Sequence, residues 1–193
     1  MEGAVAMATG KLWDLSKQNL VDCEPDSYGC EGGFIDSGFQ YGIDEGVNLE
    51  KNYPYTMGDY ESGDDTKGTC SKSGKEIFVS SYTTVNSGRT KYDEELLTNN
   101  LATVGPISIA IDADGRKMAY YSSGVHYDSS CGYKPSQLNH AVTAVGYGTG
   151  SDGDYYIVKN SWGDDWGDGG FIKMARGESN NCGVATDTSY PTY

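Results

Sequence analysis

Apolar residues recur at helical spacing in the first quarter of the chain. Ile35, Phe39 and Ile43 stand four residues apart, which predicts an amphipathic helix that ends near Gly46. Ser16 is of a residue type that commonly caps helices, and it precedes a short candidate helix over residues 17–23. The first part of the chain is therefore expected to be helical.

The first ten residues carry another helical pattern. Val5 and its small neighbours share one face, and Gly10 suits a helix C-cap. No N-cap residue precedes them, so we expect the C-terminal end of a longer helix that begins ahead of Met1. Met1 is then either an initiator or an internal residue of a longer precursor, and the second interpretation is preferred.

Strand patterns dominate the second half of the chain. Asp93 is a candidate cap for a helix that runs to Ala102. After this helix, the apolar pattern predicts mostly antiparallel strands over residues 107–111, 120–127, 140–147, 155–159 and 171–175. Helices first and strands later indicate an α+β protein with two lobes and a cleft between them.

The change of pattern also predicts where the lobes begin and end. Residues 1–82 are expected to form a helical lobe and residues 83–193 a β-rich lobe, with residues 83–92 as the link. Residues 52–75 are polar and rich in glycine, which predicts a long surface loop.

Composition and charge limit the classes of function. The 27 glycines and 16 tyrosines favour turns and half-buried strands over a helical bundle. Acidic side chains outnumber basic ones by 28 to 14, and the net charge of −14 argues against nucleic acid or an anionic membrane as a partner. No apolar run approaches the roughly 18 residues of a membrane span.

Five cysteines add a constraint on the compartment. None of them lies in a CxxC spacing of the kind that binds zinc or performs redox chemistry. Four can form two disulfides in an oxidising compartment. The fifth is then a thiol, a bridge to another chain, or a residue whose partner is missing.

His140 and Asn160 carry the candidate chemistry. His140 opens an apolar strand, and Asn160 follows the next strand. A histidine base needs a third group to fix its tautomer, and a neutral amide can accept the ring N–H while leaving the charge for a thiolate partner. By itself a histidine at a strand start is more often structural, and His126 is assigned to that structural class.

Several motifs together resemble the papain-like cysteine proteases, cathepsin L in particular. They match that family in order and cover nearly the whole chain: Leu20-Val21-Asp22-Cys23, Gly29-Cys30-Glu31-Gly32-Gly33, Tyr53-Pro54-Tyr55, Gly105-Pro106-Ile107-Ser108, Leu138-Asn139-His140, Gly146-Tyr147-Gly148, Lys159-Asn160-Ser161-Trp162-Gly163 and Ser189-Tyr190-Pro191. The resemblance implies a helical lobe and an antiparallel β-barrel-like lobe, with the active site in the cleft.

The resemblance also implies roles for individual residues. His140 is the base and acid, Asn160 orients it, and Trp162 shields their hydrogen bond. The family disulfides map to Cys23–Cys70 and Cys131–Cys182, which leaves Cys30 outside both pairs. The positions that match substrate-binding sites of the family are Gly32, Gly33, Ile35, Ala110, Leu138 and Asp187.

The family further implies the partners and the compartment. The expected substrates are polypeptides, and a propeptide or cystatin-like inhibitors are expected partners; no cofactor or metal is implied. The compartment is lysosomal or extracellular. Asp187 matches the base of the S2 pocket, where an acid in relatives lets arginine enter, so tolerance of arginine at P2 is predicted. Alternatively, Asp187 points to solvent.

One family segment is absent from these 193 residues. The glutamine of the oxyanion hole and the Cys-Gly-Ser-Cys-Trp segment with the nucleophile should lie before Met1, so no turnover is expected from this chain alone. An alternative is a non-proteolytic relative such as the silicateins, which carry serine at the nucleophile position. Asn139-His140-Ala141 in place of Asp-His-Gly, and the acidic, hydroxyl-rich surface, support that alternative.

Overall fold

The structure, a computed structural model, describes residues 1–56, 67–71, 74–87 and 92–193. Half of the predicted surface loop over residues 52–75, namely residues 57–66 and 72–73, lies outside these ranges. The chain divides into two compact units, Met1–Thr83 with Pro191–Tyr193, and Thr84–Tyr190. Residues 191–193 thus belong to the first unit, whereas the boundary expected from the sequence places them in the second.

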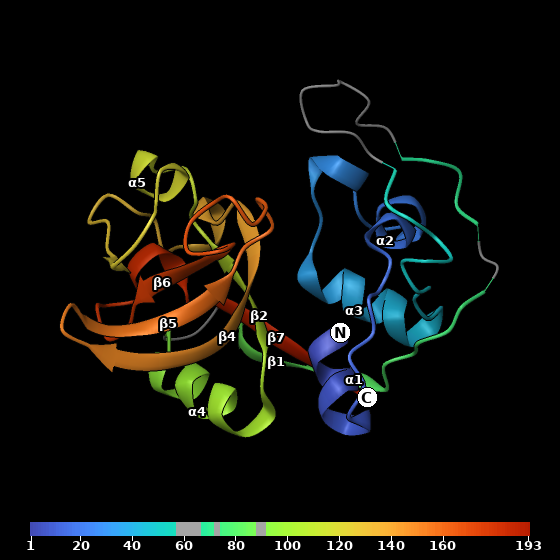
Figure 1. Cartoon of the computed structure of the whole chain (residues 1–193), viewed down its shortest axis with the longest axis horizontal. Helices are drawn as coiled ribbons and strands as arrows, with labels where there is room; N and C mark the ends of the chain where they lie inside the picture. The colour runs from blue at the N-terminus through green and yellow to red at the C-terminus, as the bar shows by residue number, and fades with distance from the viewer. Residues whose placement is uncertain (57–66, 72–73, 88–91) are drawn as a thin grey trace. The chain divides into compact units, whose positions relative to one another are not determined.

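The first unit is built from helices, as expected. Its elements are α1 (Glu2–Thr9), α2 (Lys17–Cys23), the 3₁₀ helix η1 (Gly29–Glu31) and α3 (Ile35–Asp44) (Figure 1). The predicted cap of α2 is confirmed, because the Ser16 hydroxyl oxygen accepts a hydrogen bond from the Asn19 N–H at 2.9 Å. Gly10 ends α1 in the left-handed conformation. A buried cluster closes the unit: Val5, Leu15, Cys23, Tyr41, Val47, Leu49 and Ile77.

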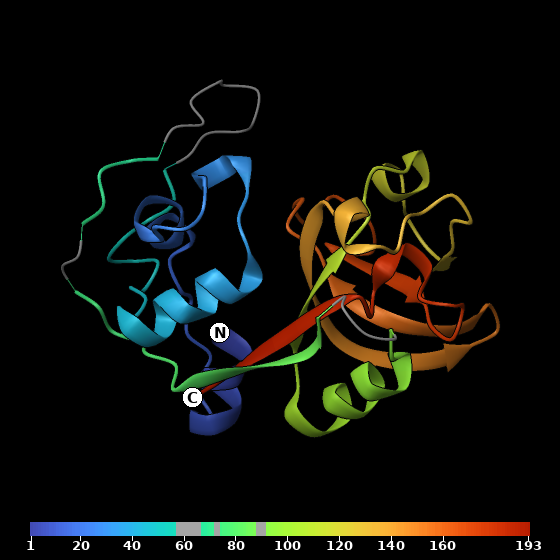
Figure 2. The same ribbon diagram turned by 180° about the vertical axis from the view of Figure 1, so that it is seen from behind.

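The strands form one sheet of seven in the described residues, in the order β1-β7-β2-β4-β5-β6-β3. Their bounds are β1 (Ser81–Ser87), β2 (Ile107–Ile111), β3 (Val125–His126), β4 (His140–Gly150), β5 (Gly153–Lys159), β6 (Phe171–Ala175) and β7 (Asp187–Thr192). β1 and β7 run side by side in both views (Figure 2). The predicted α+β fold is confirmed.

Strand β2 shows why the second unit has a core. Ile107, Ile109 and Ile111 alternate with more exposed residues, and all three are fully buried. The remaining helices of this unit are α4 (Glu94–Val104), α5 (Arg116–Ala119), and the 3₁₀ helices η3 (Pro135–Gln137) and η4 (Asn181–Gly183). Helix α4 packs against β4 and adds Leu97 and Leu101 to the same buried cluster (Figure 1).

One expectation for the second half is wrong. Of the strand predicted over residues 120–127, only β3 exists, because the Tyr121 hydroxyl donates to the Gly124 carbonyl at 2.7 Å and closes a turn there. Gly124 has φ +79°, a conformation that ends an extended run. The link predicted over residues 83–92 begins at the boundary between the two units, and residues 83–87 of it belong to β1. Residues 88–91 lie outside the described ranges. β3 also pairs parallel to β6, although the other strand pairings of known register are antiparallel.

No helix in the described ranges is both long enough and apolar enough to cross a membrane.

Candidate active site

The structure brings His140 and Asn160 into direct contact. His140 is the first residue of β4, and Asn160 comes directly after β5. The two strands pair antiparallel with Thr143 opposite Lys159, so the start of one lies beside the end of the other. The His140 Nε2 atom lies 2.8 Å from the Asn160 Oδ1 atom. Twenty residues of sequence thus separate two side chains that the hairpin places at hydrogen-bonding distance.

The surroundings of Asn160 decide which way its amide points. Its side-chain Oδ1 atom also accepts the backbone N–H of Ser161 at 2.8 Å. The backbone N–H of Asn160 donates to the Gly170 carbonyl at 2.9 Å. Since Oδ1 faces a fixed donor, the atom that meets Nε2 is an acceptor, and His140 carries its proton on Nε2. The Nδ1 atom of the neutral ring is then the nitrogen with a free lone pair, which can accept a proton.

One tryptophan stacks beside the histidine, and a second tryptophan supports the first. The Trp162 ring lies 5.1 Å from the His140 ring between centroids, with 31° between their planes. Trp166 contacts Trp162 edge-on at 5.1 Å, and its indole N–H donates to the Ala119 carbonyl at 3.2 Å. Asn160 is buried, with 8% of its surface exposed, whereas Trp162 is 40% exposed. The amide end of the histidine–amide hydrogen bond is therefore the end that lies away from solvent.

Glycine makes the tight turn behind the tryptophans possible. Gly167 has φ +63°, and a Cβ atom there would come within 2.5 Å of the Phe171 carbonyl oxygen. The turn is closed by the Gly170 N–H, which donates to the Trp166 carbonyl at 2.8 Å. This conformation holds the Gly170 carbonyl where it accepts from the Asn160 N–H.

Asn139 holds the backbone beside His140 in place. In the sequence it stands out only as a departure from the family pattern. Its N–H donates to the Ile111 carbonyl at 3.0 Å, and its Oδ1 atom accepts the Ala113 N–H at 2.9 Å. Its Nδ2 group lies 3.4 Å from an Asp112 carboxylate oxygen. These contacts tie the residue before His140 to the end of β2, and so fix where β4 begins.

The expected substrate positions of the second unit lie around one end of the sheet. Ala110 on β2 is opposite Asp187 on β7 and opposite Ala141 on β4, so these three residues share one face across adjacent strands. That face is the one opposite the buried isoleucines of β2. Leu138 follows η3, two residues before His140, and its side chain lies against Gly183.

The expected positions of the first unit form a group of their own. Gly32 and Gly33 follow η1, and together with Leu20 and Phe34 they line a surface hollow. Gly32 has φ +115°, and a side chain on Gly33 would collide with Ser27. Ile35 begins α3 directly after them. An exposed backbone of this kind suits pairing with an extended peptide.

The cysteines and the second histidine take other places. Cys23 is bonded to Cys70, and Cys131 to Cys182, which are the pairs that the family resemblance implies. Cys30 is exposed in η1, outside both disulfides. His126 lies far from solvent in β3, and burial is the main cause that lowers the pKa of its imidazole, against the opposing charge of Asp128.

The fold and the contact between His140 and Asn160 are those expected from the papain-like resemblance, and comparison with known proteins gives the family. The model of the papain family cysteine proteases matches residues 1–192, and the chain belongs to that family.

Relatives of known sequence are cathepsin L-like. A cathepsin L-like peptidase of Aedes aegypti is 48% identical over 197 residues, and digestive cysteine proteinase 3 of Homarus americanus is 43% identical over 195 residues. These alignments cover 99% and 100% of this chain, but 54% and 57% of the relatives. The chain thus spans little more than half the length of the relatives that it matches.

Solved structures of papain-like proteases have the same fold as this chain. Digestive procathepsin L 3 of the Tenebrio molitor larval midgut superposes with a TM-score of 0.86 at 40% identity, over 100% of this chain and 60% of that one. The cysteine protease CMS1MS2 of Carica candamarcensis, in complex with E-64, gives a TM-score of 0.83 at 36% identity, over 99% of this chain and 83% of that one.

Proposed function

We propose that this chain provides the base and the substrate-binding surfaces of a cathepsin L-like cysteine endopeptidase. The single observation that carries the proposal is the 2.8 Å contact between His140 Nε2 and Asn160 Oδ1 beside Trp162. In this arrangement Nδ1 of His140 takes the proton of a thiol nucleophile and later returns it to the leaving amine. The Asn160 amide, being neutral, orients the imidazolium without cancelling the charge that stabilises the thiolate.

The nucleophile of this reaction comes from outside residues 1–193. Four of the five cysteines are in disulfides, and Cys30 does not occupy the family's nucleophile motif. In the whole protein, a Cys-Gly-Ser-Cys-Trp segment is expected ahead of residue 1, together with the glutamine that completes the oxyanion hole. Residues 1–193 expressed alone are expected to hydrolyse no peptide, since loss of a catalytic group typically costs several orders of magnitude in kcat.

The decisive experiment determines the mass and the N-terminal sequence of the native protein, and then measures peptide hydrolysis by the whole protein and by residues 1–193. Turnover by the whole protein alone, blocked by a thiol-alkylating reagent, supports the proposal. Robust turnover by the purified 193-residue chain would refute it.

The alternative function is that of a silicatein-like or pseudoenzyme relative with a templating or binding role. The acidic surface and Asn139 in place of the family's aspartate favour it. The residue at the nucleophile position distinguishes the two functions. Cysteine there means a protease, whereas serine, glycine or no such segment means the non-proteolytic relative.

Specificity at P2 follows from the proposed protease. Ala110 and Asp187 are opposite each other across β2 and β7, which puts a carboxylate beside a small side chain on one face of the sheet. A small residue leaves room for a long P2 side chain, and the carboxylate attracts a guanidinium. Arginine is therefore expected to be accepted at P2 beside leucine and phenylalanine.

Peptides that differ only at P2 test this specificity in the whole protein. Asp187→Asn is expected to lower kcat/KM for the arginine peptide by about tenfold or more, the equivalent of one charge-assisted hydrogen bond. The leucine peptide serves as the matched control, and its kcat/KM is expected to stay within about twofold. Rejection of arginine at every pH by the unaltered protein would contradict the assignment.

The proposed substrates are polypeptides, and a propeptide and cystatin-like inhibitors are the proposed partners. The two disulfides suit a lysosomal or extracellular compartment.

A further inference from the structure

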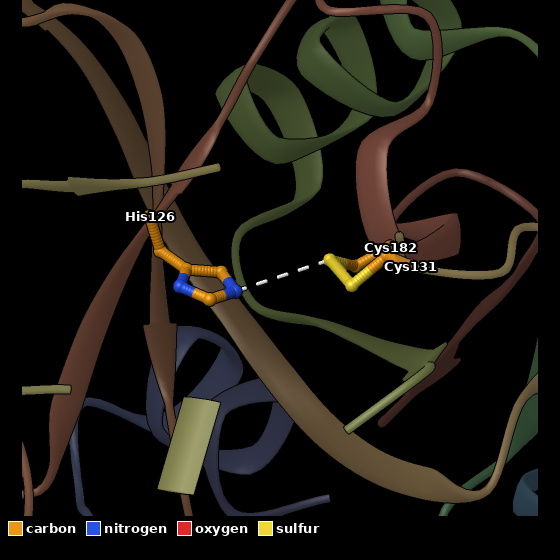
Figure 3. A group of neighbouring side chains, drawn as sticks. All are labelled: His126, Cys131 and Cys182. Carbon is orange, nitrogen blue, oxygen red and sulfur yellow. Dashed lines mark hydrogen bonds between the residues drawn. A yellow bond between two sulfur atoms is a disulfide. The ribbon is translucent and has the colours of Figure 1, made fainter. Parts of the chain in front are cut away.

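Three side chains that can bind a metal ion converge in the second unit, and none of them belongs to the His140–Asn160 pair. The Nε2 atom of His126 and the sulfur atoms of Cys131 and Cys182 all lie within 4.8 Å of one another. Nε2 points at the Cys182 sulfur from 3.9 Å (Figure 3). In the described part of the chain, these residues form the one group of three such side chains that meets this geometry.

In the disulfide-bonded protein this group binds no metal, because each sulfur is bonded to the other. Reduction by a thiol of the glutathione class changes that. Two molecules of the thiol supply two electrons and two protons, the sulfur–sulfur bond breaks, two cysteine thiols form, and the reductant leaves as its own disulfide. A divalent ion then displaces the two thiol protons and binds both thiolates.

Hydrogen bonds hold the three residues together without using the sulfur atoms. The Asn181 side chain accepts the Asp128 N–H at 3.1 Å and donates to the Asp128 carbonyl at 2.8 Å. This pair joins the segment after His126 to the residue before Cys182. The site is therefore expected to keep its arrangement after the disulfide is broken.

Asp112 makes a second connection of the same kind. Its N–H donates to the Cys182 carbonyl at 3.0 Å, and its carboxylate accepts the N–H of Gly132, next to Cys131, at 2.6 Å. One residue at the end of β2 thus holds the backbones on both sides of the disulfide.

The imidazole is also fixed from its other side. His126 pairs with Met174 between β3 and β6, and Tyr121 contacts its ring edge-on with centroids 6.2 Å apart. His126 is 6% exposed and Cys182 is 1% exposed, so both lie in a site with little access for bulk water. A ligand atom that is already aimed loses little freedom when a metal binds.

We propose that His126, Cys131 and Cys182 form a redox-gated zinc site, which opens when the Cys131–Cys182 disulfide is reduced. Two thiolates and one imidazole suit Zn²⁺, and the fourth position of a tetrahedral ion is left to a ligand other than these three side chains. Hard ions such as Ca²⁺ and Mg²⁺ prefer oxygen ligands and do not compete for this donor set. The site does not depend on peptidase activity.

The test reduces the protein with a phosphine, removes the reductant without oxygen, and titrates Zn²⁺ against a chromophoric chelator. Co²⁺ replaces Zn²⁺ in a parallel titration, because its absorption spectrum reports thiolate ligands and tetrahedral geometry. The matched variants are His126→Phe, which keeps all five cysteines, and the pair Cys23→Ser with Cys70→Ser, which removes the other disulfide. Circular dichroism follows the fold of each reduced protein.

The reduced protein is expected to bind one Zn²⁺ and to give a tetrahedral Co²⁺ spectrum with thiolate bands, and the oxidised protein neither. His126→Phe should weaken Zn²⁺ binding by at least about 100-fold. Even groups that only hydrogen-bond to a metal ligand typically change the metal affinity by about 10- to 100-fold. The serine pair should still bind. The proposal is overturned if the reduced protein does not bind Zn²⁺, if His126→Phe binds equally well, or if binding requires Cys23 and Cys70. If reduction unfolds the chain, the flexible thiols would bind Zn²⁺ equally well in the unaltered protein and in His126→Phe. That result would also overturn the proposal.

Discussion

In the proposed protease, the Asn160 amide decides which nitrogen of His140 acts as the base. Because the Asn160 Oδ1 atom faces both the Ser161 N–H and the His140 ring, the amide cannot turn its NH₂ group toward the imidazole without losing a hydrogen bond. In the described part of the chain, Asn160 Nδ2 is buried without a hydrogen-bond partner. A flipped amide would set this NH₂ group against the Ser161 N–H, donor against donor, so the observed orientation is favoured although Nδ2 has no partner.

This arrangement predicts the effect of Asn160→Ala on the proposed protease. Without the amide, His140 loses its fixed tautomer and its orientation. We expect kcat to fall by about 100-fold, the lower end of what a positioned acid–base group typically contributes. Steady-state hydrolysis of a peptide substrate by the whole protein, measured across pH, checks this.

The control for that variant is its stability. A similar melting temperature, together with an altered pH profile of kcat/KM, separates a positioning role from general damage to the fold. Unchanged kcat in a folded Asn160→Ala variant would show that the amide does not orient the base.

The residue types of the site were predictable, and some of their supports were not. His140, Asn160 and Trp162 belong to motifs with recognisable order and spacing. The role of Asn139 depends on where β2 ends in space, since its partners are the carbonyl of Ile111 and the N–H of Ala113. The only local signal was a polar residue directly before His140.

At the scale of elements, side-chain caps decide where two helices begin. The Asp93 carboxylate accepts the Leu96 N–H at 2.8 Å at the start of α4, as the sequence predicted. We expect Asp93→Ala to lower the free energy of unfolding by about 1 kcal/mol, because a helix donor loses its acceptor. Asp93→Ser is the matched control and should lose less, since serine is itself a good cap. Urea denaturation of the three proteins measures the difference, and equal losses would contradict a capping role.

Tyr156 on β5 is expected to make the fold less stable at high pH. Its hydroxyl donates to the Glu94 carbonyl at 3.0 Å and lies 3.1 Å from the Thr98 hydroxyl. Burial is the main cause that raises the pKa of Tyr156, and the negative charge of Glu94 adds to it. The folded state therefore keeps its proton where the unfolded state loses it. The stabilisation is complete below the ordinary tyrosine pKa of about 10 and declines as pH rises above it.

Comparison with Tyr156→Phe isolates this contribution from the other tyrosines. At pH 8 the variant is expected to be less stable by about 1 kcal/mol, the typical worth of a buried hydrogen bond. Above pH 10 the difference should narrow, because only the unaltered protein has the Tyr156 proton to lose. Denaturation curves between pH 8 and 11 test this, and a constant or growing difference would contradict it.

Strand prediction failed where pairing, not local pattern, decides the conformation. Residues 120–127 contain tyrosines and valine that favour strands, yet the Tyr121 hydroxyl bonds to Gly124 and only two residues extend. β1 is the opposite case, since it alternates weakly and becomes a strand because β7 lies beside it. β7 itself contains Pro191, which weakens any strand signal from its sequence.

At the scale of the whole molecule, each unit has its own buried cluster and its own disulfide. Cys23–Cys70 spans 47 residues of the first unit, and Cys131–Cys182 spans 51 residues of the second. Closing a loop of this length stabilises a fold by up to about 4 kcal/mol through the entropy of the unfolded chain. Replacement of either pair by serine is expected to destabilise mainly the unit that carries it.

Hydrogen exchange measured by mass spectrometry tests this, because it reports each unit separately. The Cys23/Cys70 variant should lose protection in α2 and α3, while β4 and β5 keep theirs. The Cys131/Cys182 variant should show the reverse. Equal loss of protection in both units, from either variant, would show that the units unfold as one.

The sequence alone determined the fold class, the helices with clear caps, and the two residues of the proposed catalytic pair. These depend on local chemistry, namely periodicity, capping residues and motifs that keep their order along the chain. Only the tertiary structure decided that β1 and β7 are strands, that Asn139 supports the start of β4, and that His126 faces the Cys131–Cys182 disulfide. Each of these features depends on contacts between residues far apart in the sequence, and a local sequence pattern does not predict such contacts. His140 and Asn160 themselves meet because β4 and β5 pair in one register, which places an amide oxygen against an imidazole.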